Sequence, residues 1–134
     1  MNGTPIEMIK AYVTAFETLE PVSVAAFYHL PSLFMSPGGV VLVSDSAGAQ
    51  GLASVLIEQA QAQGYRRSEI LNLDIKTLAE TLATISGVFV RFNSKAEEIS
   101  RFGFAYALRR ESMGWKIVTA IAHDAPSAHG FAVH

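Results

Sequence analysis

Apolar residues recur every three or four positions in the opening segment, which predicts a helix with one buried face. They are Ile6, Ile9, Val13, Phe16 and Leu19, with Tyr12 beside them. Thr4 and Glu7 have the spacing of a capping box, and Pro5 suits the first helical position. We therefore expect a helix that begins after Thr4 and ends before Pro21.

Short apolar runs separated by proline and glycine follow this helix. Residues 22–30 favour a second helix. Two short apolar runs, at 33–35 and 40–43, flank a Pro-Gly-Gly turn and predict a hairpin. Serines around an aspartate then offer caps for a third helix over residues 47–63, with Gly64 as its stop.

The second half of the chain changes from helical to alternating periodicity. We expect four long strands between Tyr65 and His123, joined by polar turns. In the first strand Leu71, Leu73 and Ile75 alternate with polar residues, and we expect these three on the buried face. Helices followed by a meander predict an α+β fold. It has three N-terminal helices packed on an antiparallel sheet of four long strands plus a short hairpin.

The composition favours a single domain with an apolar surface. The chain has 134 residues, of which 50% are hydrophobic and 16% are charged, whereas charged residues make up about 25% of a typical domain. We expect a core over residues 4–124 and a tail over residues 125–134 that can fray or cross to a partner subunit. Exposed apolar surface usually marks a partner or a ligand, and a homodimer is the simplest partner.

Charge and residue usage exclude several classes of function. The net charge of −2 gives no electrostatic basis for binding nucleic acid or an anionic membrane. The chain has no cysteine, so disulfides and thiolate metal sites are absent. No metal-ligand cluster and no phosphate-binding loop is present, and we expect no cofactor. The opening residues do not form a secretory signal, which favours a cytoplasmic location.

The order of these elements resembles the nuclear transport factor 2-like superfamily, including its SnoaL-like branch. The resemblance covers roughly residues 4–124. It rests on the Tyr12-to-Phe16 helix face, on Ser36-Pro37-Gly38 between the short strands, and on Gly114-Trp115-Lys116-Ile117 near the end. It implies a cystatin-like cone, in which a strongly curved sheet wraps around the long helix and encloses a pocket. Members often dimerise through the outer face of the sheet, and they include isomerases, dehydratases, cyclases and many proteins without enzymatic activity.

The ketosteroid isomerase branch of this superfamily implies three catalytic positions. Its tyrosine corresponds to Tyr12, its base to Ser36 before Pro37, and its third member to Tyr106, eight residues before Gly114. A serine hydroxyl is not a base near neutral pH, so proton abstraction lacks its agent. The resemblance therefore does not extend to ketosteroid isomerase chemistry.

A pairing argument predicts which side chains share the inner face. If Arg110 pairs with Trp115, the following pairs face each other in turn: Leu108 and Ile117, Tyr106 and Thr119, Phe104 and Ile121, and Phe102 and His123. The expected lining is mostly aromatic, and it either fills the core or surrounds an apolar or aromatic ligand. These residues are Tyr12, Phe16, Phe27, Tyr28, Phe34, Phe102, Phe104, Tyr106, Thr119, Ile121 and His123.

The candidate catalytic residues are His123, Asp74 and Tyr106. His123 either lies near the pocket as an acid or base, or caps a strand end beside Asp124. Asp74 either serves as a general base in the pocket, or lies on the outer face of the sheet. We expect Arg91 and Arg101 to point outward, because the strand register that places Val88 and Val90 inward requires it. A shift of one residue would instead give an anion-binding pocket.

The leading hypothesis is a protein that binds a small molecule, or serves as a scaffold, with a mostly apolar internal pocket and no complete catalytic set. The alternative is a SnoaL-like lyase, isomerase or cyclase that acts on a small carbonyl or polyketide-like substrate with His123, Asp74 and Tyr106. A third hypothesis is an interaction subunit of a larger assembly. We expect a homodimer through the outer sheet face, because Gly103, Ala105 and Ala107 make that face smooth.

Overall fold

A computed structural model describes residues 3–124, and the expected tail at 125–134 lies outside the described residues. Within that range the helices are α1 (Pro5–Glu17), α2 (Pro21–Ala25) and α3 (Ser46–Ala62). The strands are β1 (Tyr28–Ser36), β2 (Gly39–Val43), β3 (Arg67–Ala79), β4 (Leu82–Phe92), β5 (Glu98–Glu111) and β6 (Gly114–Asp124).

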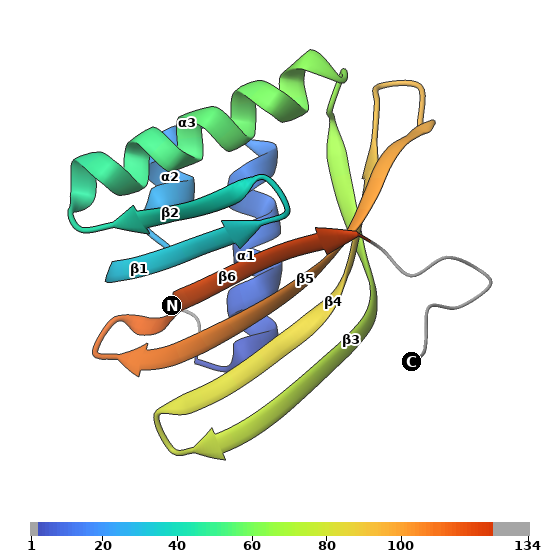
Figure 1. Cartoon of the computed structure of the whole chain (residues 1–134). Helices are drawn as coiled ribbons and strands as arrows, with labels where there is room; N and C mark the ends of the chain where they lie inside the picture. Colours follow the sequence, from blue (N-terminus) through green and yellow to red (C-terminus); the bar gives the residue numbers. More distant parts are fainter. Residues whose placement is uncertain (1–2, 125–134) are drawn as a thin grey trace.

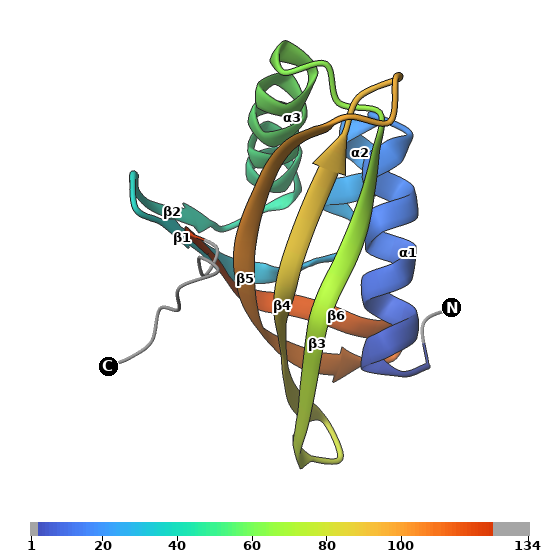
Figure 2. The same ribbon diagram turned by 90° about the vertical axis from the view of Figure 1, so that its right-hand side faces the viewer.

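The six strands form one curved sheet in the order β2-β1-β6-β5-β4-β3. All neighbours pair antiparallel except β1 and β6, which run parallel, so the sheet is mixed. Helix α1 lies against the strands, and α3 runs beside the β1–β2 hairpin (Figure 1). The long strands bend as they pass α1 (Figure 2). The molecule therefore has the predicted α+β architecture, with a parallel pair that the antiparallel prediction lacked.

Helix α1 begins and packs largely as its sequence predicts. The Thr4 hydroxyl accepts a hydrogen bond of 3.1 Å from the Glu7 amide, which caps the first turn. The buried side chains of the helix include Met8, Tyr12 and Phe16. Ile6 was expected on the same face, but it is 41% exposed. Met8 takes the buried place in the first turn instead.

The second predicted helix is short, because its later residues join the sheet. Helix α2 ends at Ala25, and β1 begins at Tyr28, so the prediction of helix over residues 22–30 was wrong for its second half. The cause is a partner far along the chain: Tyr28 pairs with Ile117 of β6, and the Ile117 amide donates a 2.8 Å hydrogen bond to the Phe27 carbonyl. A local pattern cannot reveal such a pairing.

The predicted hairpin and the third helix are confirmed. Strands β1 and β2 pair antiparallel up to Ser36 and Gly39. Asp45 caps α3, since its carboxylate accepts a 2.8 Å hydrogen bond from the Gly48 amide. Gly64 follows the helix with a φ of +85°, a left-handed conformation that glycine adopts at little cost.

A bulge in β6 changes which of its side chains face inward. Leu108 pairs with Ile117 as predicted, but the next pair is Ala107 with Thr119, so one residue of β6 is left over between them. Tyr106 consequently pairs with Ala120 and not with Thr119. The predicted facing of Phe104 with Ile121 and of Phe102 with His123 is wrong for the same reason: their partners are Ala122 and Asp124.

A second irregularity divides the apolar residues of β3. The pairing with β4 shifts between Leu71 and Asp74, where Asn72 has a φ of 56°. Leu71 and Leu73 are exposed by 38% and 36%, whereas Ile75 packs against the core. The expectation that all three share the buried face was wrong, because the irregularity changes the phase of the alternation.

Candidate ligand cavity

A cavity of about 550 Å³ lies between α1, α3, the β1–β2 hairpin and the inner face of the long strands. Its volume falls in the range of small-molecule sites. Most of its wall is apolar. The lining residues are Tyr12, Val13, Phe16, Phe34, Ser36, Gly38, Gly39, Val40, Val41, Leu52, Val55, Leu56, Gln59, Ser68, Phe89, Arg91, Phe102, Tyr106 and Ala122.

Some of the aromatic residues expected in the lining border this cavity, and others lie elsewhere in the core. Tyr12, Phe16, Phe34, Phe102 and Tyr106 line it. The remaining three are not part of its wall: they are Phe27, Tyr28 and Phe104, of which Phe104 is fully buried. The aromatic set therefore serves both as packing and as cavity wall.

The structure does not bring His123 or Asp74 to the cavity. His123 pairs with Gly103, and its ring covers the position that a side chain at Gly103 would occupy. Its Nδ1 lies 2.9 Å from the carbonyl oxygen of Asp124, as in the strand-end interpretation. Asp74 is exposed on β3, opposite Ser86. Thr119 and Ile121 share the outer face with His123, because the bulge reverses their orientation.

Three buried tyrosines meet at one end of the cavity. The hydroxyls of Tyr12 and Tyr28 lie 2.8 Å apart and share a hydrogen bond. The rings of Tyr12 and Tyr106 are perpendicular, with centroids 6.2 Å apart. Burial raises the pKa of Tyr12, and raises the pKa values of Tyr28 and Tyr106 further. These hydroxyls therefore stay neutral near pH 7, where they donate and accept hydrogen bonds but do not act as bases.

Ser36, at the position where the resemblance places the base of ketosteroid isomerases, lines the cavity. Its hydroxyl accepts a 3.2 Å hydrogen bond from the Gly38 amide and so shapes the hairpin turn. No aspartate, glutamate or histidine is part of the described cavity wall. Within residues 3–124, no group of three such side chains could hold a metal ion. The cavity therefore has hydrogen-bonding groups without a general base.

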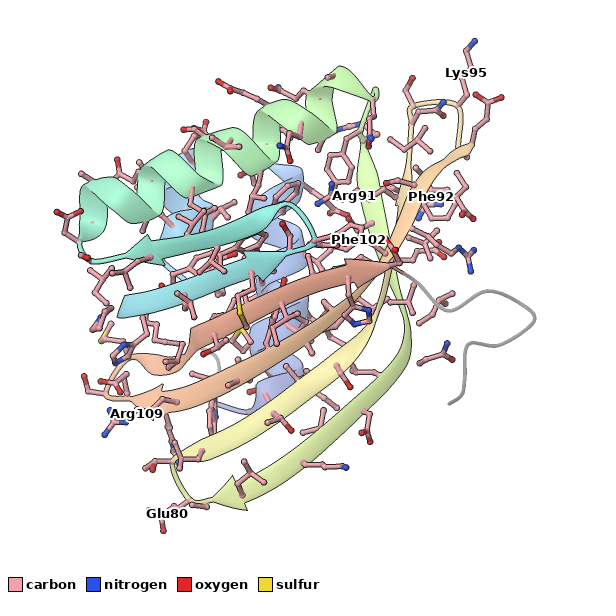
Figure 3. The ribbon with its side chains drawn as sticks, viewed as in Figure 1. Glu80, Arg91, Phe92, Lys95, Phe102 and Arg109 are labelled. Carbon is pink, nitrogen blue, oxygen red and sulfur yellow. The ribbon has the colours of Figure 1, made fainter. Side chains whose placement is uncertain are left out.

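Arg91 lines the cavity, which corrects the prediction that it faces outward. Phe89 pairs with Phe102, so Arg91, two residues after Phe89, falls on the inner face of β4. Figure 3 shows Arg91 and Phe102 on the helix side of the sheet and the next residue, Phe92, on the other side. Arg101 does lie exposed, where it forms a salt bridge with Glu98.

Aromatic rings surround the Arg91 guanidinium. Its central carbon lies 4.9, 5.4 and 4.8 Å from the ring centroids of Phe16, Tyr65 and Phe102. Each distance suits a cation–π interaction. Burial lowers the pKa of Arg91, although a guanidinium stays charged in proteins. Its Nε is buried without a hydrogen-bond partner among the described residues.

Sequence reasoning gave Arg91 a place in the pocket only as the alternative, and it missed the part of the wall that α3 supplies. Leu52, Val55, Leu56 and Gln59 line the cavity from successive turns of α3. Their spacing of three and four residues was a usable signal, because it places them on one helix face. For Arg91 the signal was weaker, since only the register between β4 and β5 decides which face it occupies.

A second hollow of about 470 Å³ lies near the start of α3. Tyr28 lines it together with His29, Glu111 and Lys116. His29 Nε2 lies 3.6 Å from a carboxylate oxygen of Glu111. The Tyr12–Tyr28 hydrogen bond therefore joins a side chain of the main cavity to one of the second hollow.

A curved sheet packed on three helices, with a cavity between them, is the architecture of NTF2-like proteins with the cystatin-like fold. The family model for "NTF2-like protein (DUF6841)" matches residues 6–125. The chain therefore belongs to this family, whose description names no activity, and the resemblance inferred from the sequence is confirmed. No curated protein matches the sequence. No helix in residues 3–124 is long and apolar enough to cross a membrane.

Solved structures share this fold at low sequence identity. A protein of unknown function from Nostoc punctiforme is similar with a TM-score of 0.75 at 13% identity, over 95% of this chain and 97% of that chain. An NTF2-like protein from Novosphingobium aromaticivorans is similar with a TM-score of 0.71 at 16% identity, over 92% and 81%. A candidate ketosteroid isomerase from Parabacteroides distasonis has a TM-score of 0.67 at 12% identity, over 92% and 89%. At these identities the likeness shows the fold alone.

Proposed function

We propose that this protein binds a small, mostly apolar molecule in the cavity and does not transform it by acid–base chemistry. The observation that carries the proposal is the cavity wall itself. It offers about 550 Å³ of aromatic and aliphatic lining with a few convergent polar groups. Among residues 3–124, no carboxylate or imidazole that could accept a proton is part of this wall.

The polar groups support binding of a ligand that carries an oxygen or another acceptor. The hydroxyls of Tyr12 and Tyr106 lie in the wall and remain protonated, because burial raises the pKa of both. Tyr106 can donate one hydrogen bond to a ligand, and Tyr12 can do so when Tyr28 is the donor of the bond that they share. An enzymatic role with His123 or Asp74 would need one of them beside Tyr106, and neither lines the cavity.

The proposal is tested with a neutral fluorescent probe, N-phenyl-1-naphthylamine, whose emission rises in an apolar site. Ala122→Phe adds a ring to the cavity wall, whereas Ala105→Phe makes the same change on the opposite face of the sheet. We expect the wild type and Ala105→Phe to bind the probe. In Ala122→Phe the affinity should fall at least about tenfold, since overfilling a packed site costs about 1–3 kcal/mol.

Two results would contradict the proposal. One is the absence of probe binding by the wild type at concentrations where the protein stays folded. The other is equal binding by Ala122→Phe and Ala105→Phe, which would place the probe on the surface. Circular dichroism of each variant establishes that it has kept the fold.

A further inference from the structure

Arg91 is the one charged side chain in the described cavity wall, and no carboxylate of residues 3–124 forms a salt bridge with it. Acidic side chains elsewhere have other partners: Glu17 accepts a 3.0 Å hydrogen bond from the Ser68 amide, and Glu69 pairs with Arg67. A buried charge without a counter-ion is costly. An unpaired guanidinium in a cavity is therefore a feature that a ligand can complete.

The aromatic rings around Arg91 do not satisfy its donors. Cation–π attraction acts on the face of the guanidinium, whereas its five N–H bonds point outward in the plane of the group. The Nε donor is buried without an acceptor. The rings of Phe16, Tyr65 and Phe102 hold the cation in place and leave its in-plane hydrogen bonds available. Because Nε is shielded, an oxygen acceptor that enters from the cavity would bind the terminal N–H groups of the guanidinium.

The shape and charge of the site favour a planar monoanion. The guanidinium fork matches the two oxygens of a carboxylate, which it binds through parallel hydrogen bonds. A single positive charge balances one carboxylate, but it leaves a phosphate dianion with an uncompensated negative charge in an apolar cavity. Beyond Arg91 the wall is mostly aromatic and aliphatic, so the rest of the ligand must be apolar.

Building on the proposed function, we infer that the cavity selects a monocarboxylate with an apolar body, whose carboxylate pairs with Arg91. The body lies between the aromatic side chains of the sheet and the apolar face of α3. The Tyr12 and Tyr106 side chains belong to the same wall, and their hydroxyls are close enough to Arg91 to interact with its charge. They can donate to a second polar group of the ligand. This names the ligand class of the cavity: an aromatic or aliphatic carboxylic acid in its ionised form.

The test compares three ligands with the same naphthalene body at pH 8: 2-naphthoate, neutral 2-naphthamide and 2-naphthyl phosphate. Dissociation constants are measured by calorimetry and by displacement of the neutral probe. We expect naphthoate to bind about 10- to 100-fold more tightly than naphthamide, the range for a hydrogen bond to a charged group. It should also bind more tightly than the phosphate. The advantage should persist at higher salt, because a buried pair is screened weakly.

Arg91→Met removes the charge and keeps an apolar stem, and Arg101→Met is the matched control on the exposed side of the neighbouring strand. We expect the preference for naphthoate over naphthamide to disappear in Arg91→Met and to remain in Arg101→Met. The ligand comparison in the wild type decides the inference by itself if Arg91→Met does not fold.

The outcomes separate this inference from the proposed function. If the neutral probe binds but naphthoate has no advantage over naphthamide, the anion preference is wrong and apolar binding stands. If the phosphate binds most tightly, the assignment to carboxylates is wrong. If neither the probe nor any naphthyl ligand binds, the proposed function fails and the inference fails with it.

Discussion

The two faces of the β5–β6 pair differ in what their side chains can do. On the inner face Phe102 and Tyr106 border a cavity and alternate with a fully buried Phe104. On the outer face Ala105 and Ala107 are small and partly exposed. The same strands thus carry a packed, ligand-sized interior on one side and a smooth surface on the other. The bulge at Val118 alone decides which of the two faces each later residue of β6 occupies.

The largest difference between the faces should appear in stability. Tyr106→Ala removes a buried ring, and we expect it to lower the free energy of unfolding by about 3–5 kcal/mol. The control His123→Ala lies on the exposed side and should lower it by at most about 1.5 kcal/mol, the value of one hydrogen bond. Urea unfolding of both variants measures the contrast. Similar losses in the two variants would mean that the faces are not as different as the burial indicates.

High pH should destabilise the folded chain through its buried tyrosines. Burial raises the pKa of Tyr12, Tyr28 and Tyr106 in the folded chain, whereas in the unfolded chain each has a pKa of about 10. Above that pH the unfolded state releases protons that the folded state keeps, so stability falls as the pH rises. Each such group contributes up to about 1.4 kcal/mol per pH unit.

Absorbance at 295 nm and circular dichroism follow this transition together. We expect the absorbance of ionised tyrosine to rise only as the chain unfolds. Tyrosine ionisation near pH 10 in a chain that keeps its circular dichroism would show that the tyrosine cluster is open to water.

The outer face is expected to form a homodimer, which stays a prediction. Ala105→Arg places a charge in the middle of this face, and we expect it to weaken self-association at least about tenfold, which corresponds to about 1.4 kcal/mol. Sedimentation velocity at micromolar concentration measures the change, with Ala47→Arg on the exposed start of α3 as the control. A wild-type monomer under these conditions would contradict the dimer.

The smallest effect concerns Gly103 on the outer face. A Cβ at this position would overlap the His123 ring, so Gly103→Ala must displace that ring and its contact with the Asp124 carbonyl. We expect a loss of about 0.5–1.5 kcal/mol, the value of one hydrogen bond. The loss should vanish when the substitution is made in a His123→Ala background. If Gly103→Ala still lowered the stability of the His123→Ala variant by the same amount, the cause would lie in the backbone of β5.

The sequence predicted most elements, because their signals are local. The cap at Thr4, the hairpin before Val40 and the stop at Gly64 all depend on neighbouring residues. What it could not predict depends on partners far along the chain. Residues 28–30 were predicted as helix but begin β1, whose Tyr28 pairs with Ile117 of β6.

In the candidate site, too, the residues set by local signals were predicted and those set by distant partners were not. Tyr12 and Phe16 follow from the helix period, and both line the cavity. Arg91 was placed on the wrong face, and the pairing argument put Thr119 and Ile121 on the inner face, because register and bulges decide the orientation of these side chains. In a strand, an error of one residue reverses every later side chain.

The residues of the cavity wall come from nearly the whole described chain, from Tyr12 in α1 to Ala122 in β6. No shorter fragment contains all its sides, so the site exists only when the first helix and the last strand have both docked. Any occupant therefore binds the folded state and not the unfolded chain, and its binding energy adds to global stability. At about 100 times its Kd, a ligand would add about 2.7 kcal/mol. Thermal melting alone can thus serve to screen compound collections for molecules that bind in the cavity.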